Sequence, residues 1–215
     1  MSSLTMGSKK ILVATSQNLL AEGICLLIKH SDTRHSIGYA KTMQSLKAIL
    51  QHNSCDAVVL AEPTFGFPIS FVAREIKNTN PYCSIIALQT GRSIFSASCM
   101  LKNGIKAWFP PDCDLTEVLD ALGKVERGAM YMSEYMAEKI AYEVSGRDAP
   151  HMMLSDRETE VLFFLIKGYS LTKTAKLLLI SLEAVYRYFN NIKRVLRINN
   201  KSELIHYSLE HNILP

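Results

Sequence analysis

Residues that could bind a metal ion or carry out catalysis are scattered along this chain of 215 residues. The cysteines are Cys25, Cys55, Cys83, Cys99 and Cys113, and the histidines are His30, His35, His52, His151, His206 and His211. No two cysteines have the C-x-x-C spacing, and the histidines lack the spacings of metal ligands. The strings G-x-x-x-x-G-K, G-x-G-x-x-G and G-x-S-x-G, typical of nucleotide and hydrolase sites, are absent. We therefore expect no enzyme, no metal and no cofactor, and we interpret the cysteines as small buried residues in a reducing cytoplasm.

Positive charge gathers in the last part of the chain. From residue 171 onward there are seven Lys and Arg residues and three acidic residues. Their net charge of +4 equals that of the whole chain. The cations are Lys173, Lys176, Arg187, Lys193, Arg194, Arg197 and Lys201, and the acids are Glu183, Glu203 and Glu210. An anionic partner is therefore expected to bind there. No apolar run approaches the roughly 18 residues that span a bilayer, so we expect a cytoplasmic protein with no membrane partner.

The segment from residue 151 onward has repeated helix starts and no strand pattern. Ser155 and Glu158 fit a capping box, and Gly168 is typical of a helix end. Further caps predict helices from Ser170 to about 178, from Ser181 to about 196, and from 200 to about 211. The predicted core of this four-helix bundle is Val161, Leu162, Leu165, Leu171, Ala175, Leu178, Ile180, Val185, Ile192, Leu196 and Leu204.

Between residues 10 and 125, short apolar runs alternate five times with helix-like stretches. The predicted strands are 11–14, 35–39, 57–61, 84–88 and 107–109, and the predicted helices are 19–29, 43–51, 69–78, 94–102 and 115–125. Three of the strands are continuous apolar runs, which is typical of strands buried on both faces. This alternation predicts a five-stranded parallel sheet, and right-handed crossovers make it a doubly wound α/β fold.

Two domains are expected. A helix is predicted over 133–142, and residues 143–150 have the Gly, Pro and small polar composition of a linker, which predicts a boundary near 146–151. The predicted organisation is an α/β domain at 9–128, a helix and linker at 129–153, and an all-α domain at 154–215.

The two predicted helices on either side of residues 179–181 have the pattern of a helix-turn-helix, whose second helix enters the major groove of DNA. The amino-acid sequence of these helices is a more specific signal. It reads L-S-D-R-E-T-E-V-L at 154–162, K-G-Y-S at 167–170 and A-K-L-L-L-I-S-L-E-A-V at 175–185. Over residues 154–209 the chain resembles the LuxR-type helix-turn-helix of the NarL/FixJ response regulators. The N-terminal half is similar in layout to the flavodoxin-like receiver domain of that family.

The resemblance does not extend to the chemistry of a receiver. The family has two acidic metal ligands, a phosphate-accepting aspartate, a switch hydroxyl, a lysine and an aromatic switch residue. The corresponding positions are Thr15 and Ser16, Ala61, Gln89, Pro111 and Trp108. Because the polar positions supply no anion, nucleophile or cation, the resemblance implies a domain that is not phosphorylated on aspartate. Glu62 is open to two interpretations: a solvated residue at the strand end, or a carboxylate in the pocket that imitates the phosphorylated state.

One stripe of the cationic helix, Glu183, Tyr186, Arg187 and Asn190, has the i, i+3, i+4, i+7 spacing and could face base edges. Arg187 matches guanine, and Glu183 could accept a hydrogen bond from cytosine. Phosphate contacts are expected from Lys173, Lys193, Arg194 and Lys201. The full predicted set is Lys173, Ser181, Leu182, Glu183, Tyr186, Arg187, Asn190, Lys193, Arg194 and Lys201. Alternatively, Tyr186, Tyr188 and Phe189 are packing residues and the cations form an ordinary solvated face.

These patterns favour a sequence-specific DNA-binding transcriptional regulator, an orphan or atypical response regulator that acts independently of aspartyl phosphorylation. Its receiver-like half is expected to serve dimerisation. The expected partners are double-stranded promoter DNA, a second copy of the chain, and RNA polymerase or a partner regulator. Two alternatives stay open: a protein-interaction adaptor, and a ligand-sensing regulator whose receiver-like domain binds a partner or a small molecule.

Overall fold

The structure is a computed structural model that describes residues 8–31, 35–52, 55–89, 95–110, 112–145, 149–211 and 213. The chain divides into two compact units, formed by residues 1–90 with 100–137 and by residues 91–99 with 138–215. Within the described ranges, no helix is both long and apolar enough to cross a bilayer.

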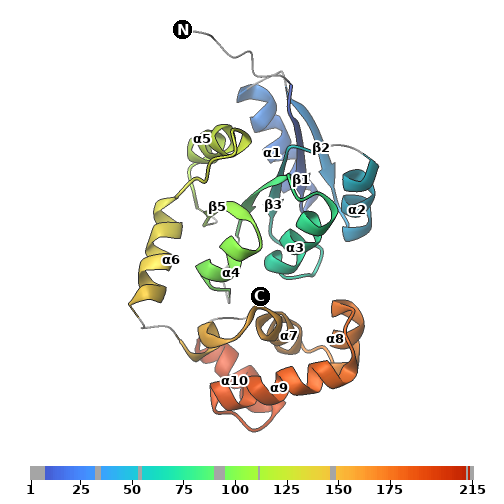
Figure 1. The fold of residues 1–215 in the computed structure, drawn as a ribbon, viewed down its shortest axis with the longest axis vertical. Helices are drawn as coiled ribbons and strands as arrows, with labels where there is room; N and C mark the ends of the chain where they lie inside the picture. Colours follow the sequence, from blue (N-terminus) through green and yellow to red (C-terminus); the bar gives the residue numbers. More distant parts are fainter. Residues whose placement is uncertain are drawn as a thin grey trace. The chain divides into compact units, whose positions relative to one another are not determined.

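The first unit is built around a parallel sheet with the strand order β2-β1-β3-β4-β5 (Figure 1). The strands are β1 (Lys10–Ala14), β2 (Ser36–Ala40), β3 (Ala57–Ala61), β4 (Ser84–Leu88) and β5 (Ile105–Phe109). All four strand pairs are parallel, so every connection must cross over the sheet, and a helix lies in each connection. The predicted five-stranded doubly wound fold is confirmed.

Helices cover the two faces of this sheet. They are α1 (Asn18–Ser31), α2 (Met43–His52), α3 (Ile69–Thr79), α4 (Ala97–Lys102) and α5 (Leu115–Glu126). On one face, Val13 and Val59 of the sheet join Ile24 of α1 and Leu122 of α5 in a single apolar cluster. Helices α2 and α3 pack on each other on the other side of the sheet (Figure 1). β1 and β3 are therefore buried from both sides, as their apolar runs predicted.

Several observed boundaries differ from the predicted ones by one to three residues. β5 begins at Ile105, two residues earlier than expected. The prediction that α4 begins at residue 94 is wrong for residues 95 and 96, which are not helical, while residue 94 lies outside the described residues. The Ser96 hydroxyl accepts a hydrogen bond from the Cys99 N–H (2.9 Å), which is the geometry of a helix cap and explains the start at Ala97.

Within the described residues, the second unit is helical. It contains most of α6 (Glu134–Val144), the 3-10 helix η1 (Pro150–Met153), α7 (Asp156–Ile166), α8 (Leu171–Leu178), α9 (Leu182–Leu196) and α10 (Lys201–Glu210). The capping box at Ser155 is present, and Ser170, Ser181 and Asn200 each accept a hydrogen bond from a backbone N–H three residues later. The predicted all-α domain with its four capped helices is confirmed.

The core of this unit is larger than the sequence predicted. All predicted core residues are buried except Leu171 and Ile180, which are half-buried. Residues 150–153, at the end of the segment expected to be helix and linker, form η1 with His151 buried. The Tyr207 hydroxyl of α10 explains the difference: it lies 3.0 Å from His151 Nδ1 and accepts a hydrogen bond from the His151 N–H (3.3 Å).

Candidate nucleic-acid interface

Helix α9 is held against α7 and α8 by one buried face. Val185, Ile192 and Leu196 are buried on this face because helix residues seven and eleven apart lie on the same side. α8 ends at Leu178 and is followed by Leu179, whose backbone is left-handed (φ 55°). α9 begins after Ser181, whose Oγ accepts a hydrogen bond from the Ala184 N–H (3.1 Å). Only three residues separate the two helices, so α8 and α9 have the joint of a helix-turn-helix.

The opposite face of α9 is exposed. Glu183, Arg187 and Asn190 are exposed side chains, and Tyr186 has 50% of its surface accessible. Leu182, at the start of the helix, is also exposed. The predicted stripe therefore lies on the surface. The alternative in which Tyr186 is a packing residue does not fit this exposure, whereas Tyr188 and Phe189 are half-buried.

Two cations of α9 are oriented by neighbouring side chains. Arg194 Nη2 donates to Asn191 Oδ1 (2.5 Å), and Asn191 Nδ2 donates to Glu158 Oε1 of α7 (2.5 Å). Lys193 Nζ lies 5.3 Å from the centre of the Phe189 ring. Arg194 is exposed and Lys193 is half-exposed, so both keep their charge at the surface.

The two predicted phosphate contacts outside α9 have different surroundings. Lys173 is exposed on α8, with its ammonium 5.2 Å from the centre of the Tyr169 ring. Lys201 instead donates hydrogen bonds to the carbonyl oxygens of Gly168 (3.0 Å) and Tyr169 (2.9 Å). Two of its three ammonium hydrogens are therefore used to join the end of α7 to the start of α10.

One cation that sequence reasoning left out of the candidate interface lies beside it. Arg197 is exposed and lines a shallow hollow together with Lys193, Arg194, Asn190 and Asn199. It follows the last residue of α9 in the left-handed conformation (φ 56°). Its charge was visible in the sequence, but its position depends on how the helix ends.

The predicted receiver positions meet at the carboxyl ends of the strands, where doubly wound folds bind ligands. Thr15 is buried after β1, and its Oγ1 accepts a hydrogen bond from the Gln17 N–H (3.3 Å). The hydroxyl of Ser16, an exposed residue, donates to the Pro63 carbonyl oxygen (2.8 Å). Ala61, the last residue of β3, is fully buried. The hydroxyls of Thr15 and Ser16 both have backbone partners. Among the described residues, no cluster of three or more metal-binding side chains occurs.

The switch positions are joined to each other. The Trp108 indole Nε1–H donates to Gln89 Oε1 (2.9 Å), and both side chains are buried. The Tyr135 ring meets Trp108 edge-on, with centroids 5.2 Å apart. Burial and the nearby Glu62 carboxylate raise the pKa of Tyr135 to about 12. Glu62 is half-buried beside this aromatic pair, and Pro111 lies outside the described residues.

The helices at 152–208 match the family model described as bacterial regulatory proteins, luxR family. The C-terminal domain belongs to the LuxR family. The match includes η1 from residue 152, all of α7, α8 and α9, and most of α10, so it extends over both helices of the helix-turn-helix and the helices that support them.

Sequence relatives match both units of the chain. The oxygen regulatory protein NreC of Staphylococcus carnosus is 23% identical over 214 residues, which is 95% of this chain and 99% of the relative. The response regulator protein VraR of Staphylococcus epidermidis is 23% identical over 143 residues, 65% of this chain and 67% of the relative. The resemblance to NarL-type response regulators is therefore found along nearly the whole sequence.

Solved structures share the fold of this chain. RcsB from Salmonella enterica serovar Typhimurium, bound to the promoter rprA in the presence of the phosphomimetic BeF3-, has a TM-score of 0.76 at 18% identity. The match covers 94% of this chain and 98% of RcsB. A structure described as the two-component response regulator RcsB-DNA complex has a TM-score of 0.55 with the same coverage and identity.

Proposed function

We propose that the protein is a sequence-specific DNA-binding transcriptional regulator that acts in the cytoplasm on promoter DNA. The observation that carries this proposal is α9, which buries Val185, Ile192 and Leu196 and exposes Arg187 and Asn190 on its other face. A helix held in this way can enter a major groove without rearrangement of its own domain. The LuxR-family match and the DNA-bound RcsB neighbours support the same reading.

The exposed side chains divide into base readers and phosphate contacts. Arg187, with Glu183, Tyr186 and Asn190 on the same stripe, reads base edges, and Arg187 pairs with guanine through its two parallel donors. Ser181 and Leu182 lie at the amino end of the helix, where a recognition helix approaches the bases.

Phosphate contacts come from cations around this stripe. Lys173, Lys193 and Arg194 have exposed or half-exposed charges, and Arg197 extends the same surface. Lys201 has one remaining N–H for a phosphate, so its contribution to affinity is smaller than that of the other cations.

The receiver-like unit, on this proposal, acts without aspartyl phosphorylation and serves dimerisation. Three observations support the first half: Ala61 offers no nucleophile, Thr15 and Ser16 offer no carboxylate for a metal, and Gln89 binds Trp108. Gln89 and Trp108, the buried and neutral residues at the two switch positions, have no hydroxyl that could form a hydrogen bond with a phosphoryl group. In this proposal Glu62, beside Tyr135, is a residue at the end of a strand and does not imitate a phosphorylated aspartate. The DNA-binding activity then depends on the abundance of the protein or on a partner such as RNA polymerase or another regulator.

Glu183 favours a second candidate function, that of a protein-interaction adaptor. A carboxylate in the first turn of the recognition helix repels DNA phosphates unless it points into the groove. In an adaptor, the exposed face of α9 would contact a protein and the receiver-like unit a partner regulator.

Genome-wide mapping of DNA bound by the full chain, followed by a gel shift on the best site, tests these functions. A regulator gives discrete sites and binds the best one far more tightly than unrelated DNA, whereas an adaptor gives neither. Incubation with acetyl phosphate, or with beryllofluoride and Mg²⁺, tests the receiver. We expect unchanged oligomeric state and DNA affinity, and a clear shift in either would overturn phosphorylation independence.

A further inference from the structure

Two cysteines of the first unit meet at the amino ends of neighbouring strands, the edge of the sheet opposite the receiver positions. Cys55 lies two residues before β3 and Cys83 one residue before β4. β3 and β4 pair from Ala57 and Ser84 onward, and the Ser84 N–H donates to the Asp56 carbonyl oxygen (2.9 Å). Because adjacent strands lie about 4.8 Å apart, this register brings the two cysteines close to one another.

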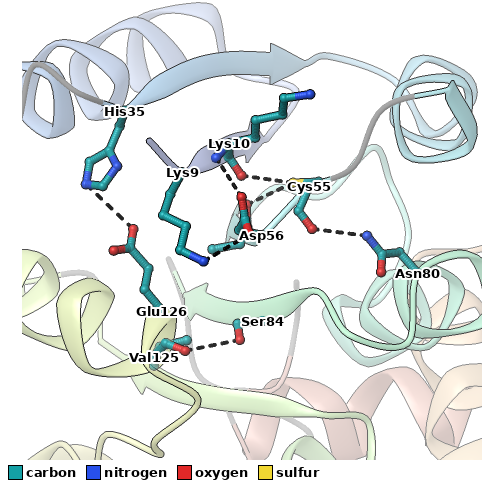
Figure 2. Close-up of polar contacts among 10 residues, drawn as sticks. Lys9, Lys10, His35, Cys55, Asp56, Asn80, Ser84, Val125 and Glu126 are labelled. Atoms are coloured by element: carbon teal, nitrogen blue, oxygen red, sulfur yellow. Dashed lines mark hydrogen bonds and ion pairs between the residues drawn. The ribbon is translucent and has the colours of Figure 1, made fainter. Parts of the chain in front are cut away.

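Asn80 holds the backbones of both cysteines. Its Nδ2 donates to the Cys55 carbonyl oxygen (3.0 Å), and its own carbonyl oxygen accepts a hydrogen bond from the Cys83 N–H (3.2 Å). Figure 2 shows the first of these contacts, together with the Cys55 thiol, which donates to the Lys10 carbonyl oxygen of β1 (3.5 Å) and to the Ala57 carbonyl oxygen of its own strand (3.1 Å). The two thiols are close enough that each one shifts the pKa of the other.

The surroundings make the two sulfurs unequal. The hydrogen bond from the Cys83 thiol holds the pKa of Cys55 below its usual value, although burial opposes this effect. The same hydrogen bond, together with burial, raises the pKa of Cys83. Both residues are buried, with 7% and 0% of their surface exposed, so large reagents are excluded. This is the arrangement of an attacking thiol with a resolving thiol beside it.

We infer that Cys55 and Cys83 form a dithiol site which a hydroperoxide converts to an intramolecular disulfide and a thiol reductant converts back. In the first step, the Cys55 thiolate attacks one oxygen of hydrogen peroxide, the O–O bond breaks, and Cys55 becomes a sulfenic acid as hydroxide leaves. In the second, the Cys83 sulfur attacks the Cys55 sulfur and the S–O bond breaks. The leaving hydroxide takes the proton of Cys83 as water. Two thiols lose two electrons, and the peroxide is reduced to two molecules of water.

Cysteine mapping of the folded, full-length chain tests this site without any substitution. The protein is treated with hydrogen peroxide, blocked with N-ethylmaleimide in denaturant, digested, and analysed by mass spectrometry with and without dithiothreitol. We expect a Cys55–Cys83 linked peptide as the main product, lighter by two hydrogens than the two reduced peptides and lost after reduction. Protein oxidised in guanidinium is the control, since its five cysteines pair without the guidance of the fold.

Two sets of variants sharpen the test. The triple variant Cys25→Ser, Cys99→Ser, Cys113→Ser should still lose two thiols to peroxide and regain both with dithiothreitol. Cys83→Ser should stop at a Cys55 sulfenic acid, which dimedone labels when it is present as the chain is unfolded. The inference is overturned if, in the folded wild-type chain, both thiols stay free while other cysteines oxidise, or if they pair with other cysteines as often as in guanidinium. Because the readout is a linked peptide and not DNA binding, its failure is distinguishable from failure of the proposed function.

Discussion

Acid should loosen the C-terminal domain through one buried histidine. His151 has 5% of its surface exposed, and burial followed by the charge of His211 lowers its pKa from 6.5 to about 4. Between these two values the unfolded chain binds a proton that the folded chain does not, so stability falls as the pH falls. The contribution is complete above pH 6.5, is lost through the window from 6.5 to 4, and does not change further below it. A separation of 2.5 units corresponds to about 3.4 kcal/mol in total, of which about 1.8 kcal/mol is lost between pH 7 and pH 5.

Hydrogen exchange followed by mass spectrometry measures this loss at the peptides that contain η1 and α10, whose contact depends on His151 and Tyr207. The matched variant is His151→Phe, which keeps a ring in the cavity and does not titrate. Its opening free energy should lose most of the difference between pH 7 and pH 5, whereas His206→Gln, at an exposed histidine, should keep it. If His151→Phe keeps the full pH dependence, the buried imidazole is not its source.

Four further perturbations test the interface and its support. Arg187→Ala should weaken binding to the best DNA site by about 1–3 kcal/mol, or about 5- to 150-fold in a gel shift; equal losses on all sequences would refute its role as a base reader. Lys193→Ala should weaken specific and non-specific binding alike and reduce the salt slope by about one, while Lys29→Ala, an exposed cation of α1, should change neither. Ile192→Ala, at a fully buried position of α9, should lower the unfolding free energy by about 2–5 kcal/mol in urea, and a smaller loss would mean that α9 is not anchored there. Lys201→Met should cost about 1–2 kcal/mol of stability, because two carbonyl oxygens lose their donor, and should change the salt slope less than Lys193→Ala does.

Elements with strong local patterns were predictable from the sequence. β3 and β4 begin and end at the predicted residues, 57–61 and 84–88, and the helices after Ser155 and Ser181 begin where their caps indicated. Such patterns depend on neighbours within a few residues, so a single sequence contains them completely. The exposure of Arg187 followed in the same way from the helical period. The domain borders and the roles of the individual interface residues stay predictions.

Contacts between distant segments were not predictable. Lys201 donates to carbonyl oxygens 33 and 32 residues earlier, and His151 is buried by a hydroxyl 56 residues later. The sequence placed Gln89 and Trp108 at two switch positions of the family, and only the structure shows that they bind each other. These pairings depend on how the elements pack, which a single sequence does not state. Residue type alone therefore did not distinguish a lysine that contacts phosphate from one that bonds to backbone carbonyls, or a linker from a short helix.

Trp108 also gives the chain a built-in spectroscopic label. It is the single tryptophan of the sequence, and it lies fully buried within the first unit, with its indole N–H bound to an amide oxygen. Its emission therefore reports on the receiver-like unit alone, while far-ultraviolet circular dichroism includes the C-terminal helices as well. Comparing the two signals during unfolding would reveal whether the units melt together or one after the other, with no dye attached.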